Sequence, residues 1–162
     1  MANDTDLVLE RTLDAPLDLV WKAYTDPDLM KQWWAPRPYQ TPEVDIDWRP
    51  GGTFHFVMTG PDDFREDSAG CVLEYVPKQR VAWTSALGPG FRPNDLSQKD
   101  GCEAFAFTAI VTFADAGDGR TAYKAVALHK NRADRDTHEK MGFDEGWGTC
   151  AAQLEEVARS LA

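Results

Sequence analysis

The sequence is short of basic residues and of long apolar runs, and each shortage excludes a class of protein. The chain of 162 residues carries 17 Lys and Arg against 27 Asp and Glu, which gives a formal charge of −10. Its basic residues form no stripe of the kind that binds a phosphate backbone, so nucleic acid is not an expected partner. No apolar run approaches the length of a membrane span, and residues 1–10 lack the charged and apolar regions of a secretory signal. We therefore expect a cytoplasmic protein without membrane insertion.

Cysteine is also scarce. Cys71, Cys102 and Cys150 are an odd number, lie far apart and include no CxxC pair, which argues against a disulfide framework or a zinc knuckle. They are expected to be reduced and mostly buried. A GxxxxGK[ST] phosphate loop, a GxGxxG fingerprint and a GxSxG elbow are all missing. The sequence thus predicts no cofactor and no α/β-hydrolase nucleophile.

Metal-ligating residue types gather near the start of the last predicted helix. They are His129, Asp134, Asp136, His138 and Glu139. Their spacing fits no zinc pattern, and "HEKMG" has Gly142 where a zincin needs its second histidine. Capping of the helix is the simpler explanation, because Asp136 and Glu139 are spaced as a capping box. We therefore predict no metal site.

Hydrophobic periodicity predicts a single α+β domain over residues 1–162, with its core between about residues 7 and 161. Residues 7–13 alternate as a half-buried strand, and "DAPLDLVWKAYTDPDLMKQWW" predicts two short helices that begin near Pro16 and Pro27. Hairpins are expected at residues 44–58, 70–86 and 103–129, with a polar loop at 60–69. The total is about seven antiparallel strands. "LGPGFRPNDLSQKDG", residues 87–101, is too irregular for the sheet and is the kind of long loop that often covers a site.

The last segment, residues 133–161, carries an apolar stripe about 100° wide that is typical of a helix packed on a sheet. The stripe consists of Phe143, Trp147, Cys150, Ala151, Leu154, Val157, Ala158 and Leu161. Gly142 and Gly146 lie along its edge, although a glycine inside a helix costs about 1 kcal/mol relative to alanine. Two explanations stay open: a bend at Gly142, or the removal of side chains where the helix approaches the sheet or leaves a space beside it. Where helix and sheet diverge, a cavity is expected.

Three stretches, and the order of the elements, resemble a known family. "DAPLDLVWKAYTDPDLMKQWW", "RPGGTFHFVM" and "HKNRADRDTHEKMGFDEGWGTCAAQLEEVA" are similar to the START-like, or SRPBCC, superfamily, in the branch related to the C-terminal domain of the activator of heat-shock protein 90 ATPase. The resemblance covers about residues 7–161. It implies a helix-grip fold: a curved antiparallel sheet of about seven strands, two short helices after the first strand and a long C-terminal helix packed across the sheet. It also implies a cavity for an apolar or amphipathic molecule, and it leaves the chemistry undefined.

The predicted elements supply candidate walls for that cavity. The ligand-binding candidates are Trp34, His55, Trp83, Phe105, Phe107, Tyr123, His129, Phe143 and Trp147. Rigid rings build pocket walls well, although aromatic residues also fill ordinary cores. His55 is the leading polar candidate. Alternation along residues 53–58 leaves open whether its side chain points into the cavity or to solvent.

Three functions are compatible with the sequence. The favoured hypothesis is the binding of a small apolar ligand without catalysis. A cyclase or hydrolase of the same fold would need an acid or base in the pocket, for which the candidates are His55, Glu103, Tyr123 and His129. A chaperone-interacting module would need a contiguous exposed patch, and a chaperone partner is not expected because only a short polar leader precedes Leu7. A homodimer is compatible with the sequence.

Overall fold

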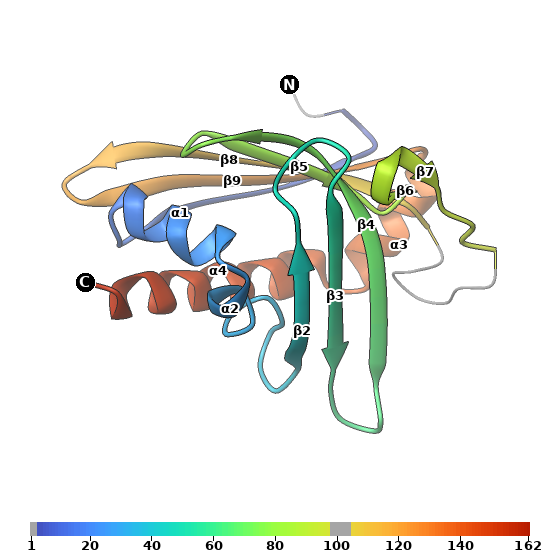
Figure 1. Ribbon diagram of the computed structural model, residues 1–162, viewed down its shortest axis with the longest axis horizontal. Helices are drawn as coiled ribbons and strands as arrows, with labels where there is room; N and C mark the ends of the chain where they lie inside the picture. The colour runs from blue at the N-terminus through green and yellow to red at the C-terminus, as the bar shows by residue number, and fades with distance from the viewer. Residues whose placement is uncertain (1–2, 98–104) are drawn as a thin grey trace.

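A computed structural model describes residues 3–97 and 105–162 as a curved antiparallel sheet that wraps round a long helix (Figure 1). The main sheet has seven strands in the order β1-β9-β8-β5-β4-β3-β2. They are β1 (Asp6–Leu13), β2 (Gln40–Ile46), β3 (Thr53–Thr59), β4 (Arg65–Val76), β5 (Arg80–Thr84), β8 (Phe107–Gly117) and β9 (Arg120–His129). The predicted α+β class and strand number are confirmed.

Strand β9 shows why these segments form a half-buried sheet. Its residues alternate between the core and solvent, and those facing the core are Thr121, Tyr123, Ala125, Ala127 and His129. Side chains on a strand point to opposite faces in turn, so this alternation places one face against the helices. The register shifts in β2, in β4 and near the end of β8. Such bulges bend and twist a strand, which accounts for part of the curvature.

Four helices complete the described fold. They are α1 (Leu17–Thr25), α2 (Pro27–Met30), α3 (Arg132–Lys140) and α4 (Phe143–Ser160). Helices α1 and α2 follow β1 as predicted, and Pro27 is the first residue of α2. Asp26 caps α2, since its carboxylate accepts a hydrogen bond from the backbone N–H of Asp28 at 2.9 Å. Figure 1 shows α4 running beneath β1, β8 and β9, with α1 beside it.

The predicted single helix over residues 133–161 is in fact two helices. Gly142 separates α3 from α4 and has φ of +94°, a left-handed conformation that glycine adopts without steric cost. The bend proposed at this glycine is therefore present. The predicted capping box is wrong: the N-cap of α3 is Asn131, whose side chain accepts from the Asp134 N–H at 2.8 Å. Asp136 and Glu139 lie inside the helix.

Two loop predictions also need correction. The predicted loop at residues 60–69 is shorter, because β4 already begins at Arg65. Part of the predicted loop at 87–101 forms a small ladder, in which β6 (Leu87–Gly88) pairs with β7 (Arg92–Pro93) around the 3₁₀ turn η1 (Pro89–Phe91). Cys102 and Glu103 lie outside the described residues. Cys71 is buried, Cys150 is half-buried, and both are free thiols.

The core consists of two neighbouring clusters of buried side chains. The larger one joins α1, α4 and β1 to the inner faces of β8 and β9, and the smaller one contains Phe54, Phe56, Val72, Trp83 and Ala109. Trp34, Phe107 and Trp147 are partly buried and pack against both clusters. Within the described ranges, no helix has the length and apolar character needed to cross a bilayer.

Candidate functional site

A cavity of about 910 Å³ lies between the sheet and the first half of α4. The second half of α4 packs closely on the core through small or branched residues such as Ala151, Leu154 and Ala158, all fully buried. The first half lines the cavity with Phe143, Gly146, Trp147 and Cys150. The helix thus approaches the sheet at one end and leaves a space at the other.

Most of the predicted wall residues come together around this space. Trp34, Trp83, Phe107, Tyr123, Phe143 and Trp147 all line the cavity. Phe105 and His129 are buried but belong to the layer behind the lining, where both rings pack against His138. Six of the nine candidates thus line the cavity, and the aromatic pattern did not distinguish lining residues from those packed behind them.

The prediction for His55 has to be corrected. Phe54 and Phe56 face the cavity, and alternation along β3 places His55 on the opposite face of the sheet. Its Nε2 lies 2.7 Å from the Asp67 carboxylate, and 28% of its side chain is exposed. His55 therefore has a polar partner near the surface and does not line the cavity.

Stacked and edge-on rings hold the wall in place. Phe54 and Trp83 are stacked with ring centroids 4.3 Å apart and planes 10° apart. Trp34 stands against this pair, with its centroid 5.7 Å from Phe54, 5.8 Å from Trp83 and 5.5 Å from Phe56. Such arrangements suit the quadrupoles of the rings and leave few alternative rotamers. The wall is largely preformed.

Side chains from α4 fix the segment that carries Trp34. Gln153, with only 2% of its surface exposed, donates from Nε2 to the carbonyls of Trp33 at 3.1 Å and Ala35 at 2.8 Å. Its Oε1 accepts from the Arg37 N–H at 3.0 Å. Because this buried amide makes three hydrogen bonds to the backbone of the segment, it fixes the position of the irregular chain around Trp34. The sequence analysis missed Gln153, because a lone polar residue on an apolar stripe gives no signal of its partners.

Three protonated groups lie at the end of the cavity near α1 and β9. Burial raises the pKa of the Tyr24 hydroxyl, and the Trp83 indole N–H partly offsets this effect. Burial also raises the pKa of Tyr123 well above its ordinary value, and it raises that of the Cys150 thiol to about 12. All three groups are therefore neutral near pH 7. Tyr24 lies in the stretch that predicted the first short helix, and it was missed as a lining residue.

A buried histidine pair lies at the other end. The Thr5 carbonyl can only accept, so His129 Nδ1 at 2.9 Å carries the proton that it donates. In the neutral pair, His129 Nε2 then accepts from His138 Nδ1 at 2.8 Å, which leaves the lone pair on His138 Nε2. Burial, followed by the charge of His129, lowers the pKa of His138 to about 4. His138 lines the cavity, so its imidazole supplies a neutral hydrogen-bond acceptor there.

The histidine pair does not have the ligands of a metal centre. Within residues 3–97 and 105–162, no three His, Cys, Asp or Glu side chains converge on one point. The four nearest rings around His138, apart from His129, belong to Phe105, Phe107, Phe143 and Trp147. An aromatic surrounding of this kind offers no oxygen or sulfur ligand to a cation.

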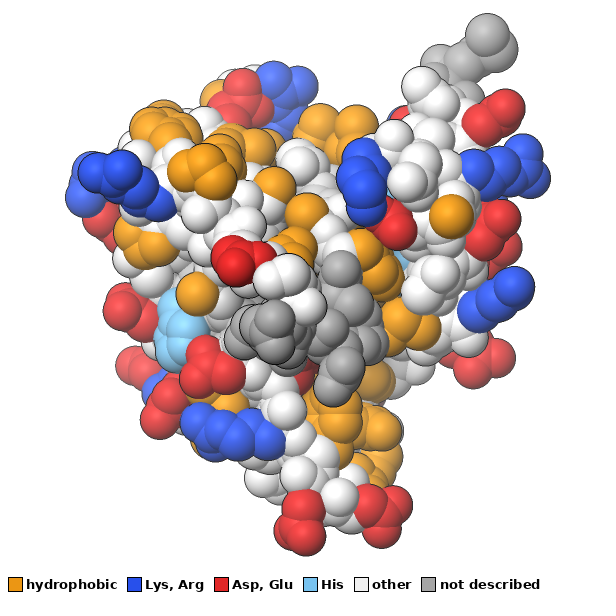
Figure 2. Space-filling model, turned by 90° about the vertical axis from the view of Figure 1, so that its right-hand side faces the viewer, with side chains coloured by type: hydrophobic (Ala, Val, Ile, Leu, Met, Phe, Trp, Pro, Cys, Tyr) orange, Lys and Arg blue, Asp and Glu red, His pale blue; other side chains and the backbone are white. Residues whose placement is uncertain are grey.

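The mouth of the cavity combines apolar and acidic side chains. Phe64 and Met141 line it although 40% and 45% of their surfaces are exposed, and Glu66, Asp67 and Asp95 lie among the same lining residues. Figure 2 shows hydrophobic side chains beside the downward projection of the molecule and acidic ones at its tip. In Figure 1 this projection is the β3–β4 hairpin.

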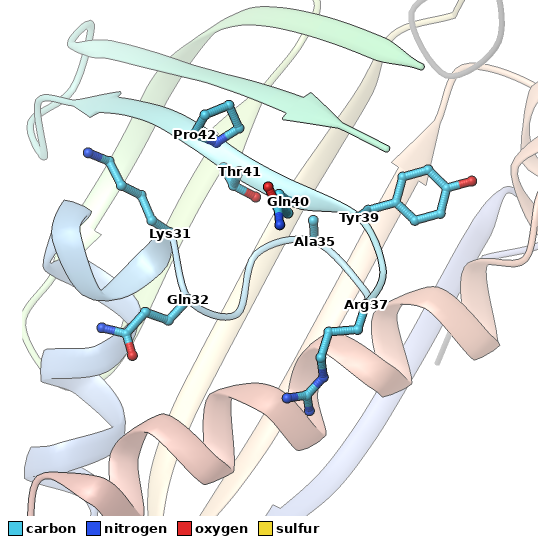
Figure 3. A pocket seen from close by; sticks show the side chains of 8 residues that line it. All are labelled: Lys31, Gln32, Ala35, Arg37, Tyr39, Gln40, Thr41 and Pro42. Atoms are coloured by element: carbon cyan, nitrogen blue, oxygen red, sulfur yellow. The ribbon is translucent and has the colours of Figure 1, made fainter. Parts of the chain in front are cut away.

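A second, smaller pocket of about 340 Å³ lies outside the sheet (Figure 3). It is formed by the chain from Lys31, just after α2, to Pro42, the third residue of β2. Figure 3 shows that its side chains diverge: the Tyr39 ring points away, and Arg37 extends toward α4, where it pairs with Glu156 at 3.0 Å. A binding site needs polar groups that converge on a ligand, so the large cavity is the better candidate.

Comparison with known proteins agrees with this architecture. Residues 14–159 match the model of the family described as Activator of Hsp90 ATPase homolog 1-like protein. The chain belongs to this family. The match spans nearly the whole fold, from the residue after β1 to the last turn of α4, and it confirms the resemblance to the START-like superfamily. No curated protein matches the chain significantly.

Solved structures of similar proteins extend the comparison. The crystal structure of protein NE0264 from Nitrosomonas europaea is 37% identical with a TM-score of 0.90, over 99% of this chain and 98% of that one. Protein Ms6760 from Mycobacterium smegmatis is 23% identical with a TM-score of 0.76, over 95% and 90%. A protein from Arthrobacter aurescens is 18% identical with a TM-score of 0.77, over 99% and 90%. The last two likenesses concern the fold alone.

Proposed function

We propose that this family member binds a small hydrophobic or amphipathic molecule in the cavity between the sheet and the first half of α4. Ligand sites of proteins are typically clefts of about 300–1,000 Å³ with apolar and aromatic walls and few polar groups. The cavity of about 910 Å³ lies within that range, and its lining includes twelve Phe, Trp and Tyr residues. Neutral polar groups stand at two ends, Tyr24 and Tyr123 at one and His138 at the other.

Gly146 is the observation that carries the proposal. It lines the cavity from within α4, and a Cβ added there would meet no atom within 4 Å among its surroundings. Glycine inside a helix costs about 1 kcal/mol relative to alanine, and nothing close to Gly146 explains that cost. An open space kept at this point does explain it, because any side chain would project into the cavity.

A substitution that fills the cavity tests the proposal. Gly146→Leu should abolish binding of the neutral probe 2-ethylnaphthalene in equilibrium dialysis, because the leucine side chain occupies the ligand space. Ala152→Leu places the same side chain on the exposed face of the same helix and is the matched control. Gly146→Leu should also raise the urea midpoint slightly, since leucine is the better helix former by about 0.5–1 kcal/mol.

Binding and stability separate the outcomes. Loss of the probe in Gly146→Leu, with retention in Ala152→Leu and folding intact in both, supports a ligand cavity. Equal binding by both variants and the wild type would place the probe elsewhere and contradict the proposal. Failure of the wild type to bind the probe, with no co-purifying molecule in the cavity, would contradict it as well.

A second candidate function is proton transfer at the ligand, and the neutral imidazole of His138 is the observation that favours it. The free lone pair of Nε2 can accept a proton from a ligand, and the lowered pKa of His138 makes it a weak base, so only slow proton transfer is expected. It would be detected as deuterium uptake into the methyl group of 2-acetylnaphthalene in D₂O. Uptake above the buffer rate that disappears in His138→Asn would support an enzyme, and uptake at the buffer rate would leave binding as the function.

A further inference from the structure

Two tyrosine side chains line the cavity from different elements. Tyr24 comes from α1 and Tyr123 from β9, and their ring centroids are 6.4 Å apart. Only 1% of Tyr24 and 7% of Tyr123 is exposed, so neither hydroxyl is at the protein surface. Among the described residues, the Tyr123 hydroxyl has no hydrogen-bond partner. The residue lines the cavity, so a bound molecule can supply a partner for this hydroxyl.

Trp83 adds a third donor beside these tyrosines. Its indole N–H is buried and lacks a hydrogen-bond partner among the described residues. Trp83 lines the same cavity as Tyr24, and its N–H partly offsets the rise that burial causes in the pKa of the Tyr24 hydroxyl. An indole nitrogen only donates, and a tyrosine hydroxyl can donate as well as accept. All three groups can therefore donate to an acceptor in the cavity.

The same end of the cavity disfavours negative charge. Tyr24, Tyr123 and Cys150 adjoin one another there, and burial makes the charged form of each less favourable. Lys and Arg do not occur among the described residues that line the cavity. A ligand carboxylate in this position would lose its hydration without gaining a cation. The carboxylates at the mouth, of which Asp67 is paired with His55, add no attraction for an anion.

We propose that the ligand is an uncharged aromatic carbonyl compound whose oxygen accepts hydrogen bonds from Tyr24 and Tyr123 while its rings lie between the aromatic walls. This inference rests on the proposed binding function and specifies the class of ligand. A carbonyl oxygen has two lone pairs and no proton, so it complements two neighbouring donors without a net charge. Fatty acids and other anions are excluded on the same grounds.

Three naphthalenes of similar shape test the polarity of the site on the unaltered protein. They are 2-ethylnaphthalene, 2-acetylnaphthalene and 2-naphthoate, each measured by equilibrium dialysis near pH 7. The ketone should bind about tenfold more tightly than the hydrocarbon, because each hydrogen bond that a buried donor gains improves affinity severalfold. The carboxylate should bind at least about tenfold more weakly than the ketone.

Variants assign the difference to a residue. Tyr123→Phe should reduce the affinity for 2-acetylnaphthalene about fivefold and leave that for 2-ethylnaphthalene unchanged. Tyr75→Phe is the matched control, because Tyr75 packs against Trp21 and Trp48 and is not among the described residues that line the cavity. Equal binding of ketone and hydrocarbon by the wild type would overturn the inference and leave the proposed function intact. Preference for the carboxylate would overturn it too, and failure of all three to bind would remove both proposals.

Discussion

Acidification should destabilise this protein through His138, and the sign follows from its surroundings. Burial in an aromatic cluster, and next the charge of His129, lowers the folded-state pKa of His138 from 6.5 to about 4. Between those two pH values the unfolded chain holds a proton on this side chain that the folded protein lacks. The free energy of unfolding therefore falls as the pH drops through this window, and the contribution is complete only above the unfolded pKa.

The magnitude follows from the gap between the two pKa values. A gap of about 2.5 pH units corresponds to about 3 kcal/mol once both states are protonated, and the slope inside the window approaches about 1.4 kcal/mol per pH unit. The ring is 4% exposed, so solvent screening reduces this figure little. A typical domain is stable by only about 5–15 kcal/mol, which makes the loss measurable.

Urea unfolding of His138→Asn and the wild type at about pH 7 and about pH 5 isolates the effect. The asparagine amide can still donate to His129, as the Nδ1 of His138 does, but it cannot be protonated. The wild type should lose about 2 kcal/mol more than the variant between these pH values, because other titrating groups are common to both. Parallel loss in the wild type and His138→Asn would refute a buried neutral imidazole at this position.

Three further predictions follow from the same contacts. Gly142→Ala should destabilise the protein by about 1–2 kcal/mol in urea unfolding, because Gly142 has a positive φ. Gly146→Ala should stabilise the protein by up to about 1 kcal/mol in the same assay, because alanine is the better helix former and the added Cβ meets no neighbour. Equal effects of the two substitutions would contradict the described backbone. Gln153→Leu should lower the free energy of unfolding by about 2–4 kcal/mol in the same assay, since it leaves the backbone groups of Trp33, Ala35 and Arg37 without their partner. A neutral effect would show that the contacts of Gln153 do not anchor this segment. The Cys150 thiol should react with iodoacetamide at least about tenfold more slowly than a free thiol, because only a small fraction of it is ionised to the thiolate near pH 8. Peptide mass spectrometry would follow the reaction, and an ordinary rate would contradict the burial of this thiol.

Periodicity accounts for how much of the fold could be predicted. The alternation of β9 and the apolar stripe of α4 identify their buried faces directly, since each element repeats its contact pattern along the sequence. A bend at Gly142 was one of the two explanations that the sequence offered for the glycines in the last helix. Both explanations apply, one to each glycine: Gly142 allows the bend, and Gly146 leaves the space.

The site was less predictable, because its polar residues depend on docking between distant elements. His138 reaches the cavity only because α3 packs on β9, where His129 meets it. The sequence places these two histidines near each other and gives no hint of burial. Tyr24 looks like any core residue on an amphipathic helix until β9 places Tyr123 opposite. His55 shows the reverse error, in which a suitable residue type lay on the outer face.

Native mass spectrometry of the freshly purified protein tests the central claim most directly. The account predicts a small uncharged molecule that remains bound in the gas phase, is released on denaturation and is much reduced in Gly146→Leu but not in Ala152→Leu. It also predicts that the emptied wild type takes up 2-acetylnaphthalene in its place. A protein that carries no such molecule and takes up none of the naphthalenes would contradict a ligand-binding cavity between the sheet and α4.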